Sequence, residues 1–312
     1  MSAKDVMTVF SPATVANVGC GFDILGFAVE QPGDEITVSL TNRKDVRILS
    51  IAGDDGKLPL DPSKNSAGVS VIALLQKLKV SQGVDITIVK KMPLGSGLGS
   101  SAAGAAGSVF ALNKLLGEPF TTQELVPFAM EGERVCSGTA HADNVAPALM
   151  GGFVTVRSYD PPDFISIPTK IPLFCLLVKP HTEILTKNAR KILQDNVPLK
   201  KLVCQTGNLA GLIIGLIRED ISLIGRSLVD VIIEPQRAPL IPGYESIRNT
   251  AYDSGAIACS ISGSGPSIFS LYSDNRKMEI AAEKIKEVCS REHISIDCFL
   301  TKINYSGIQI YE

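Results

Sequence analysis

Between residues 93 and 103 the chain reads Pro93-Leu94-Gly95-Ser96-Gly97-Leu98-Gly99-Ser100-Ser101-Ala102-Ala103, with three glycines and two adjacent serines. An apolar segment, residues 84–89, precedes it and predicts a strand, and residues 101–116 predict a small-residue helix. Glycines let backbone N–H groups approach a ligand, and the N–H groups at a helix start are unpaired and favour an anion. The run therefore predicts a phosphate-binding turn. Glycine count alone leaves open a serine-capped turn without a ligand.

Two familiar nucleotide-binding patterns do not fit this loop. A Walker loop ends in Gly-Lys-Ser/Thr, and no lysine follows these glycines. A dinucleotide-binding loop needs an acidic residue about 20 residues on, after a second strand. Here those residues predict a helix, and Glu118 lies in a turn before Pro119.

Outward from the loop, strands and helices are mixed along the chain, and the class predicted is α+β. Strands are expected at 8–10, 36–40, 46–51, 153–157, 173–179, 256–261, 267–272, 294–300 and 308–311. Helices are expected at 67–78, 122–133, 186–193, 200–217, 244–253 and 278–292. Residues 11–23 are expected to form a loop, with a turn at 160–163.

Composition narrows the class of protein. Hydrophobic residues make up 45% and charged residues 20% of 312, which is typical of a globular chain. The net charge is -2, so nucleic acid and anionic membrane are not expected as partners. The start of the chain is not expected to be a signal peptide, and the longest apolar run, residues 209–217, is too short to span a membrane.

The 7 cysteines lack the C-x-x-C spacing of zinc and redox sites. Their odd number and scatter predict a reduced, cytoplasmic protein, since free cysteine is usually a small buried hydrophobic residue, and a catalytic role for any one of them is left open.

The whole string PLGSGLGSSAA closely resembles the P-x-x-x-G-L-G-S-S-A-A phosphate-binding motif of the GHMP kinase superfamily. Residues 11–23, SPATVANVGCGFD, and 261–267, ISGSGPS, resemble that superfamily's first and third motifs. Residues 137–147, SGTAHADNVAP, and 234–243, EPQRAPLIPG, resemble strings of the homoserine kinases within it. The resemblance implies an ATP-dependent kinase that phosphorylates the hydroxyl of L-homoserine to O-phospho-L-homoserine in threonine biosynthesis. Another GHMP-type kinase, with a mevalonate- or sugar-like substrate, is the alternative.

The resemblance implies a nucleotide site for ATP and Mg²⁺. Glu133 matches the family's magnesium-binding glutamate and Ser101 its serine partner, and both are expected to be catalytic, with Glu131 as the competing carboxylate. Asn65 matches a position near the nucleotide base. The expected phosphate-binding residues are Pro93, Leu94, Gly95, Ser96, Gly97, Leu98, Gly99, Ser100 and Ser101.

A site for homoserine must offer a carboxylate to the ammonium group and arginines to the carboxylate. By resemblance, Asp23 binds the ammonium group, and Arg190 and Arg237 bind the carboxylate. The further substrate-binding residues expected are Asn17, Asp143, Asn144 and Gly263.

The general base is left open. Asn144 stands where mevalonate and galactose kinases carry an aspartate, and an amide cannot accept a proton at neutral pH. Asn144 is therefore expected to orient the substrate hydroxyl, and by the family resemblance the proton passes to the phosphate. Asp143 is the alternative base, and His141 is expected to have a structural role.

The resemblance also implies two domains and a homodimer. The expected domains are an ATP-binding domain at 1–165, like domain 2 of ribosomal protein S5, and a ferredoxin-like domain at 166–312, with ATP between them.

Overall fold

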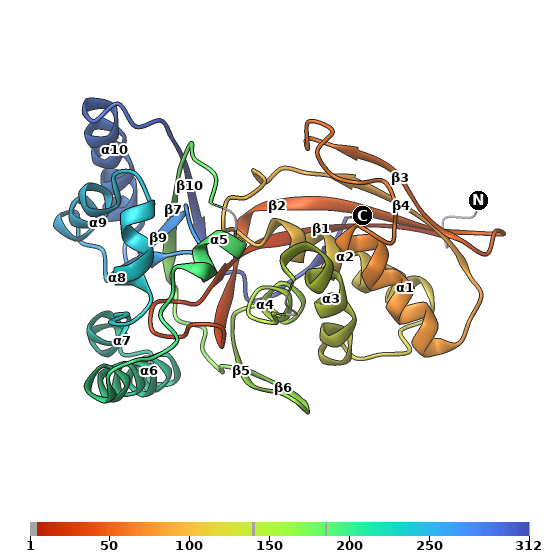
Figure 1. Cartoon of the computed structure of the whole chain (residues 1–312), viewed down its shortest axis with the longest axis horizontal. Helices are drawn as coiled ribbons and strands as arrows, with labels where there is room; N and C mark the ends of the chain where they lie inside the picture. Colours follow the sequence, from red (N-terminus) through yellow and green to blue (C-terminus); the bar gives the residue numbers. More distant parts are fainter. Residues whose placement is uncertain (1–4, 139–140, 185, 312) are drawn as a thin grey trace.

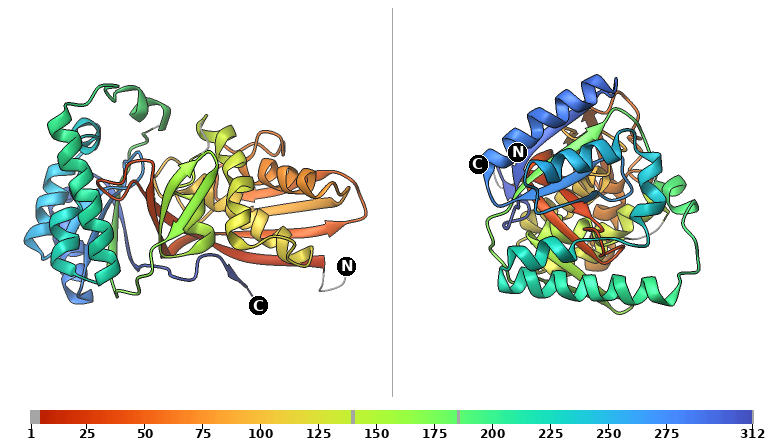
Figure 2. Two further views of the ribbon diagram at one scale, coloured as in Figure 1. Left: turned by 90° about the horizontal axis from the view of Figure 1, so that it is seen from below. Right: turned by 90° about the vertical axis from the view of Figure 1, so that its left-hand side faces the viewer.

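The computed structural model describes residues 5–138, 141–184 and 186–311. It is elongated and has two parts that lie side by side, each with its own sheet (Figure 1). A second direction of view shows the same two parts, with the end of the chain returning to the first (Figure 2).

The first part is built on a sheet that has seven strands within the described residues. Its main path runs β11-β1-β2-β4-β3, and β5 and β6 continue from β2. The long β2 pairs with β1 along its length, with β5 near its beginning and with β4 near its end. Among the strands of this sheet that the structure describes, only β3 and β4 pair in parallel. The strands are β1 (Val6–Ala16), β2 (Leu25–Thr41), β3 (Val46–Ala52), β4 (Gly83–Val89), β5 (Phe153–Tyr159), β6 (Pro162–Ser166) and β11 (Gln309–Ile310).

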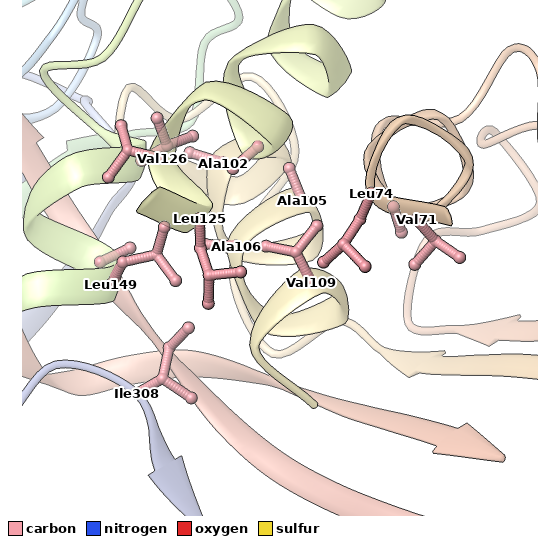
Figure 3. Close-up of a cluster of buried hydrophobic side chains, with 14 of the residues drawn as sticks. Val71, Leu74, Ala102, Ala105, Ala106, Val109, Leu125, Val126, Leu149 and Ile308 are labelled. Atoms are coloured by element: carbon pink, nitrogen blue, oxygen red, sulfur yellow. The ribbon is translucent and has the colours of Figure 1, made fainter. Parts of the chain in front are cut away.

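Helices α1 (Ser66–Leu78), α2 (Ser100–Leu115) and α4 (Val145–Met150) pack on one face of this sheet, and α3 (Thr122–Ser137) packs against these three helices. Their apolar side chains meet in one buried cluster (Figure 3). The small residues of α2 allow close approach, because a Cβ on Gly107 would lie 2.7 Å from Ile36 of β2. The helix that begins at the glycine-rich loop is thus held tightly between the sheet and its neighbours.

The second part has an antiparallel sheet in the order β10-β7-β9-β8. In chain order this is strand 4-1-3-2, the ferredoxin-like arrangement, so that expectation is confirmed. Its strands are β7 (Phe174–Pro180), β8 (Ala258–Ile261), β9 (Ile268–Tyr272) and β10 (Ile296–Lys302). Its helices are α5 (Thr186–Lys191), α6 (Leu199–Arg218), α7 (Ile221–Ser227), α8 (Glu234–Arg237), a 3-10 turn (Ala238–Leu240), α9 (Tyr244–Asp253) and α10 (Asn275–Arg291).

An apolar cluster joins the two parts. Phe27 of β2 contacts Phe153 of the same part at 4.9 Å between ring centroids. It also contacts Phe269 of β9, in the other part, edge-on at 5.6 Å. The two parts therefore share a core and do not meet only through polar loops.

The loop expected at residues 11–23 is partly wrong, because β1 continues through Ala16. Ser11 and Thr14 are polar but fully buried, and pairing with β2 overrides the local preference of this Pro-containing stretch. The turn expected at 160–163 is also partly wrong, since β6 begins at Pro162.

β6 ends in the first sheet at Ser166, and β7 begins the second at Phe174. β11 then pairs with β1 of the first sheet. The boundary at 165/166 stays a prediction. Of the described residues, no helix is both long and apolar enough to cross a membrane.

Candidate active site

The glycine-rich loop lies between β4 and α2, as expected from the sequence. Gly95, Gly97 and Gly99 all have positive φ, at 62°, 77° and 69°. Gly99 is the N-cap of α2 and offers no side-chain cap, so the first N–H groups of the helix point to the loop. A Cβ on Gly99 would lie 2.0 Å from Thr14 Oγ1 of β1, so no other residue fits there without displacement.

Two serines of the loop add buried hydroxyl groups. Ser96 is 1% exposed and Ser100 is 9% exposed, and neither hydroxyl has a hydrogen-bond partner among the described residues. Buried polar groups are nearly always paired in native proteins, so each exception needs an explanation. A bound anion supplies one, because its oxygens accept hydrogen bonds from hydroxyl groups and from the start of a helix. The loop therefore fits a phosphate group.

A buried ion pair that the sequence did not predict holds the start of the glycine-rich loop against α2. Lys90 Nζ pairs with Asp34 and donates a hydrogen bond to the carbonyl oxygen of Ser100 at 2.7 Å. Asp34 Oδ1 also accepts from the backbone N–H groups of Lys91, at 2.8 Å, and Met92, at 3.2 Å. Lys90 directly follows a buried strand, and a lysine in such a position needs a carboxylate as its partner. Nothing in the sequence indicates which carboxylate that is.

The pair predicted for Mg²⁺ comes together at the start of α2. Glu133 of α3 is 7% exposed, and the Ser101 side chain hydrogen-bonds to it. The close approach of α3 to α1 depends on Gly132, because a Cβ at this position would lie 2.4 Å from the carbonyl oxygen of Ser66 in α1. Burial raises the pKa of the Glu133 carboxyl to about 7, against the opposing effects of Ser101 and Lys90. Glu131 is instead paired with Arg134 on the surface, which disfavours it as the metal ligand.

The donors present fit Mg²⁺ bound mainly through phosphate. The described residues contain no group of three His, Cys, Asp or Glu side chains that would hold a metal alone. A carboxylate and a hydroxyl beside an anion-binding loop match the usual magnesium site, which takes one or two protein oxygens and completes itself with phosphate and water.

Opposite charges lie together in the second half of the site. Arg190 Nη2 of α5 donates to both carboxylate oxygens of Asp23, at 2.7 and 2.9 Å. It also donates to His141 Nε2 at 3.1 Å, which requires that nitrogen to be the acceptor because arginine has no acceptor atom. Burial lowers the pKa of His141, consistent with a neutral ring. His141 thus positions the pair, as the structural role expected of it requires.

Arg237 and Asn17 converge on the loop after β8. Gly263, with φ of 58°, accepts hydrogen bonds on its carbonyl oxygen from Asn17 Nδ2 at 2.7 Å and Arg237 Nη1 at 3.1 Å. Asn17 Oδ1 in turn accepts from the backbone N–H of Asp23 at 2.9 Å. Burial, with the neighbouring Arg190 charge, lowers the pKa of Arg237. The first, third and E-P-x-R motifs therefore meet at one place.

Asp143 and Asn144 lie between the two halves. Asn144 Oδ1 accepts from Thr14 Oγ1 at 2.7 Å and is 2.9 Å from where a Cβ of Gly99 would lie, so it is beside the phosphate loop. Asp143 is 3% exposed, and burial, then the charges of Asp23 and Glu133, raises its pKa to about 7. Asn144 thus lies beside the glycine-rich loop, and Asp143 is within electrostatic reach of both Asp23 and Glu133.

Asn65 has a clear structural role. It caps α1, accepting from the N–H of Ala67 at 3.0 Å and donating to the carbonyl oxygen of Pro59 at 3.0 Å. Its neighbour Ser66 donates to the carbonyl oxygen of Ser101 at 3.1 Å, which places this helix start near the phosphate loop. The contact of Asn65 with a nucleotide base stays a prediction. Thr139 and Ala140, part of the string at 137–147, lie outside the described residues.

Two aromatic residues of the site were also missed. Tyr159, from β5, donates from its hydroxyl to the carbonyl oxygen of Asp23 at 2.8 Å and accepts from the N–H of Ala142 at 3.3 Å. Nothing in its local sequence indicates this. Phe22 lies against both Arg190 and Arg237, and its only sequence signal is its place in the first motif, next to Asp23.

Known proteins are similar to this chain over nearly its full length. Residues 66–152 match the model of the GHMP kinases N terminal domain, and residues 212–291 match that of the GHMP kinases C terminal. A homoserine kinase of Chlorobium phaeovibrioides is 48% identical, covering 96% of this chain and 98% of its own. A crystal structure of homoserine kinase from Cytophaga hutchinsonii has a TM-score of 0.96 at 49% identity, covering 100% of this chain and 99% of its own.

A more distant likeness concerns the fold alone. The L. major mevalonate kinase in complex with R-mevalonate has a TM-score of 0.72 at 17% identity, covering 94% of each chain. The likeness of fold thus extends across the superfamily, while high identity over nearly the full length is to homoserine kinases. The chain is a GHMP-fold kinase and belongs to the homoserine kinase family.

Proposed function

We propose that the chain transfers the γ-phosphoryl group of ATP to the hydroxyl of L-homoserine, giving ADP and O-phospho-L-homoserine for threonine biosynthesis. One observation supports this most directly: Asp23, Arg190 and Arg237 lie together, beside the loop after β8 that contacts the glycine-rich loop through Ser262 and Gly97. That set matches an acceptor with an ammonium group, a carboxylate and a hydroxyl. A mevalonate- or sugar-like acceptor lacks the ammonium charge that Asp23 would bind.

The nucleotide half holds the donor. The N–H groups at the start of α2 and the hydroxyls of Ser96 and Ser100 bind the β- and γ-phosphates. Ser101 and Glu133 would hold Mg²⁺, which when bound would neutralise phosphate charge. A cation there would also lower the pKa of the Glu133 carboxyl and so favour its ionised form.

The acceptor half orients homoserine. Asp23 binds the ammonium group and the two arginines bind the carboxylate. Asn17 and the Gly263 carbonyl fix the loop around them. Asn144 donates or accepts one hydrogen bond with the substrate hydroxyl and so directs it towards the loop.

The transfer itself requires little covalent chemistry from the protein, since phosphoryl transfer depends mainly on positioning and charge stabilisation. The hydroxyl oxygen forms a bond to the γ-phosphorus, and the bond between that phosphorus and the β–γ bridging oxygen breaks. ADP leaves, and the hydroxyl proton passes to an oxygen of the transferred group. Asp143 is the alternative acceptor of this proton, supported by its burial next to Asn144.

The test is ADP release from purified protein, ATP and Mg²⁺ with L-homoserine, mevalonate, galactose or shikimate. Release that depends on homoserine is expected, and Glu133→Gln should lower kcat by about 10²-fold or more, because charge neutralisation is lost. Release with mevalonate or a sugar, and none with homoserine, would contradict the proposal.

We also propose that the protein is a cytoplasmic homodimer that binds neither nucleic acid nor membrane. The scattered cysteines favour a reduced, cytoplasmic location, and the net charge of -2 disfavours nucleic acid and anionic membrane as partners, while the homodimer follows from the family resemblance alone. The dimer would show as a mass of twice 33.2 kDa in light scattering, and a monomeric mass would contradict it.

A further inference from the structure

The ring of Phe22 contacts both arginines of the acceptor half. The guanidinium carbon of Arg190 lies 5.3 Å from the ring centroid, and that of Arg237 lies 5.2 Å from it. Both distances are within the range of a cation–π interaction. Two guanidinium groups on one ring repel each other, and the Arg190 charge contributes to the lowered pKa of Arg237. Their closeness therefore needs a compensating contact.

The loop that carries Phe22 is fixed independently of the arginines. Ile24 and Leu25 both donate their N–H groups to the carbonyl oxygen of Gly21, at 3.0 and 2.9 Å. Cys20 accepts on its carbonyl oxygen from Gln205 of α6 at 3.2 Å. Val18, a β-branched residue, is fully buried with φ of 36°, which is a strained conformation that the surroundings must enforce. The ring is thus presented from a rigid turn.

The other contacts of Arg190 are not sufficient to hold its side chain in place when the substrate binds. Asp23 holds Arg190 in the structure, but the substrate ammonium group competes for the same carboxylate. Arg190 comes from α5, a helix of six residues, and its side chain is 38% exposed. Once Asp23 turns to the ammonium group, the contacts that Arg190 keeps among the described residues are those with His141 and the ring. The ring is the contact that it shares with Arg237.

We propose that Phe22 is a positioning residue that holds Arg190 and Arg237 together as a carboxylate clamp and so selects acceptors that carry an α-carboxylate. The proposal rests on the proposed function, since the clamp is defined by the carboxylate of an amino-acid acceptor. Phe22 acts only through the arginines and touches none of the reacting atoms.

The test compares two acceptors in three variants. Phe22→Leu and Phe22→Met remove the ring but keep apolar volume, and Phe22→Tyr keeps the ring. With L-homoserine, the ring-less variants should raise KM about tenfold, with kcat and the KM for ATP within about twofold of the unsubstituted protein, and Phe22→Tyr should restore the KM. With 3-amino-1-propanol, which lacks the carboxylate, kcat/KM should be the same in all variants.

A matched control is Phe174→Leu. Phe174 also faces a cation, with Lys302 Nζ 5.5 Å from its ring centroid, but it lies in β7 away from the acceptor half. This variant should leave the KM for homoserine unchanged.

The outcomes separate the proposal from the function it rests on. Equal losses with both acceptors would mean that Phe22 acts by general packing, and an unchanged KM in Phe22→Leu and Phe22→Met would mean that the ring is dispensable. A Phe22→Tyr variant as impaired as Phe22→Leu would also overturn the proposal. Absence of homoserine-dependent activity in the unsubstituted protein would instead overturn the proposed function.

Discussion

The carboxyl group of Asp143 lies in surroundings that disfavour its ionised form. It is 3% exposed, it lies near Asp23 and Glu133, and its pKa is raised from 3.8 to about 7. A raised carboxyl pKa means that the folded state binds the proton more tightly than the unfolded state. Its favourable effect on stability is fully present below the unfolded pKa and is lost as pH rises through about 7.

Asp143→Asn should therefore stabilise the protein in a pH-dependent way. Without ATP or substrate, we expect the free energy of unfolding to rise on the order of 3 kcal/mol relative to the unsubstituted protein at about pH 8, and to change little at about pH 4. Urea unfolding at the two pH values measures the difference. An equal change at both would mean that the carboxyl is ionised throughout.

The same variant tests the general base. If the proton passes to the transferred phosphoryl group, kcat with homoserine should stay within about tenfold, because general-base catalysis typically contributes about 10²- to 10⁴-fold. A loss in that larger range would assign the base role to Asp143 and refute the proposed route.

At the scale of elements, the important feature is the junction of β4, the glycine-rich loop and α2. Gly99 begins α2 with a positive φ of 69° and no space for a Cβ against Thr14. Gly117, just beyond the other end of α2, has φ of 81°, but a Cβ there would have no atom within 4 Å. Substitutions at these two glycines can therefore distinguish the free energy lost to an unfavourable φ, which both positions share, from the free energy lost to steric crowding, which arises only at Gly99.

Gly99→Ala should destabilise the protein by on the order of 2–4 kcal/mol and raise the KM for ATP at least about tenfold, because it combines strain with a displaced helix start. Gly117→Ala should cost only about 1 kcal/mol and leave the KM for ATP unchanged. Thermal unfolding and ATP titrations of both variants give the comparison. Similar effects of the two on the KM would contradict the role given to the loop.

Elements with strong local signals could be predicted from the sequence. The helix expected at 244–253 is α9, and that expected at 122–133 begins as α3 does, with Thr121 as its cap. The short α4 and α7 were missed, because six or seven residues give too little periodicity. The extension of β1 through residues 11–16 was missed because only its partner β2 makes that stretch a strand.

The candidate site likewise contains residues that could be predicted from the sequence and residues that could not. Residues taken from the motif strings come together in pairs, Ser101 with Glu133 and Asp23 with Arg190, and their roles stay predictions. The Asp34–Lys90 pair could not be predicted, because its members are 56 residues apart and neither belongs to a motif. Tyr159 belongs to the same group, since only the pairing of β5 with β2 brings it to Asp23.

At the scale of the whole molecule, the shared apolar cluster couples the two parts. Phe27 lies fully buried between Phe153 and Phe269, and β11 returns the end of the chain to the first sheet. Parts that share a core and a strand should unfold together.

Calorimetry should therefore show a single cooperative transition. Phe27→Ala should lower the free energy of unfolding by about 3–5 kcal/mol while keeping one transition, as expected for a large cavity in a core. Leu199→Ala, at a side chain that is 73% exposed, should change it by about 0.5 kcal/mol or less. Two separate transitions in the unsubstituted protein would show that the parts fold independently.

The acceptor of the phosphoryl group is the side-chain hydroxyl of L-homoserine. Phosphorus NMR of the reaction with ATP, Mg²⁺ and L-homoserine tests this assignment most directly, because a phosphate ester on a CH₂ group couples to two protons and gives a triplet. A new phosphomonoester triplet that grows as the γ-phosphate signal of ATP declines is the predicted result. A signal of inorganic phosphate alone, or an uncoupled acyl phosphate signal, would contradict the account.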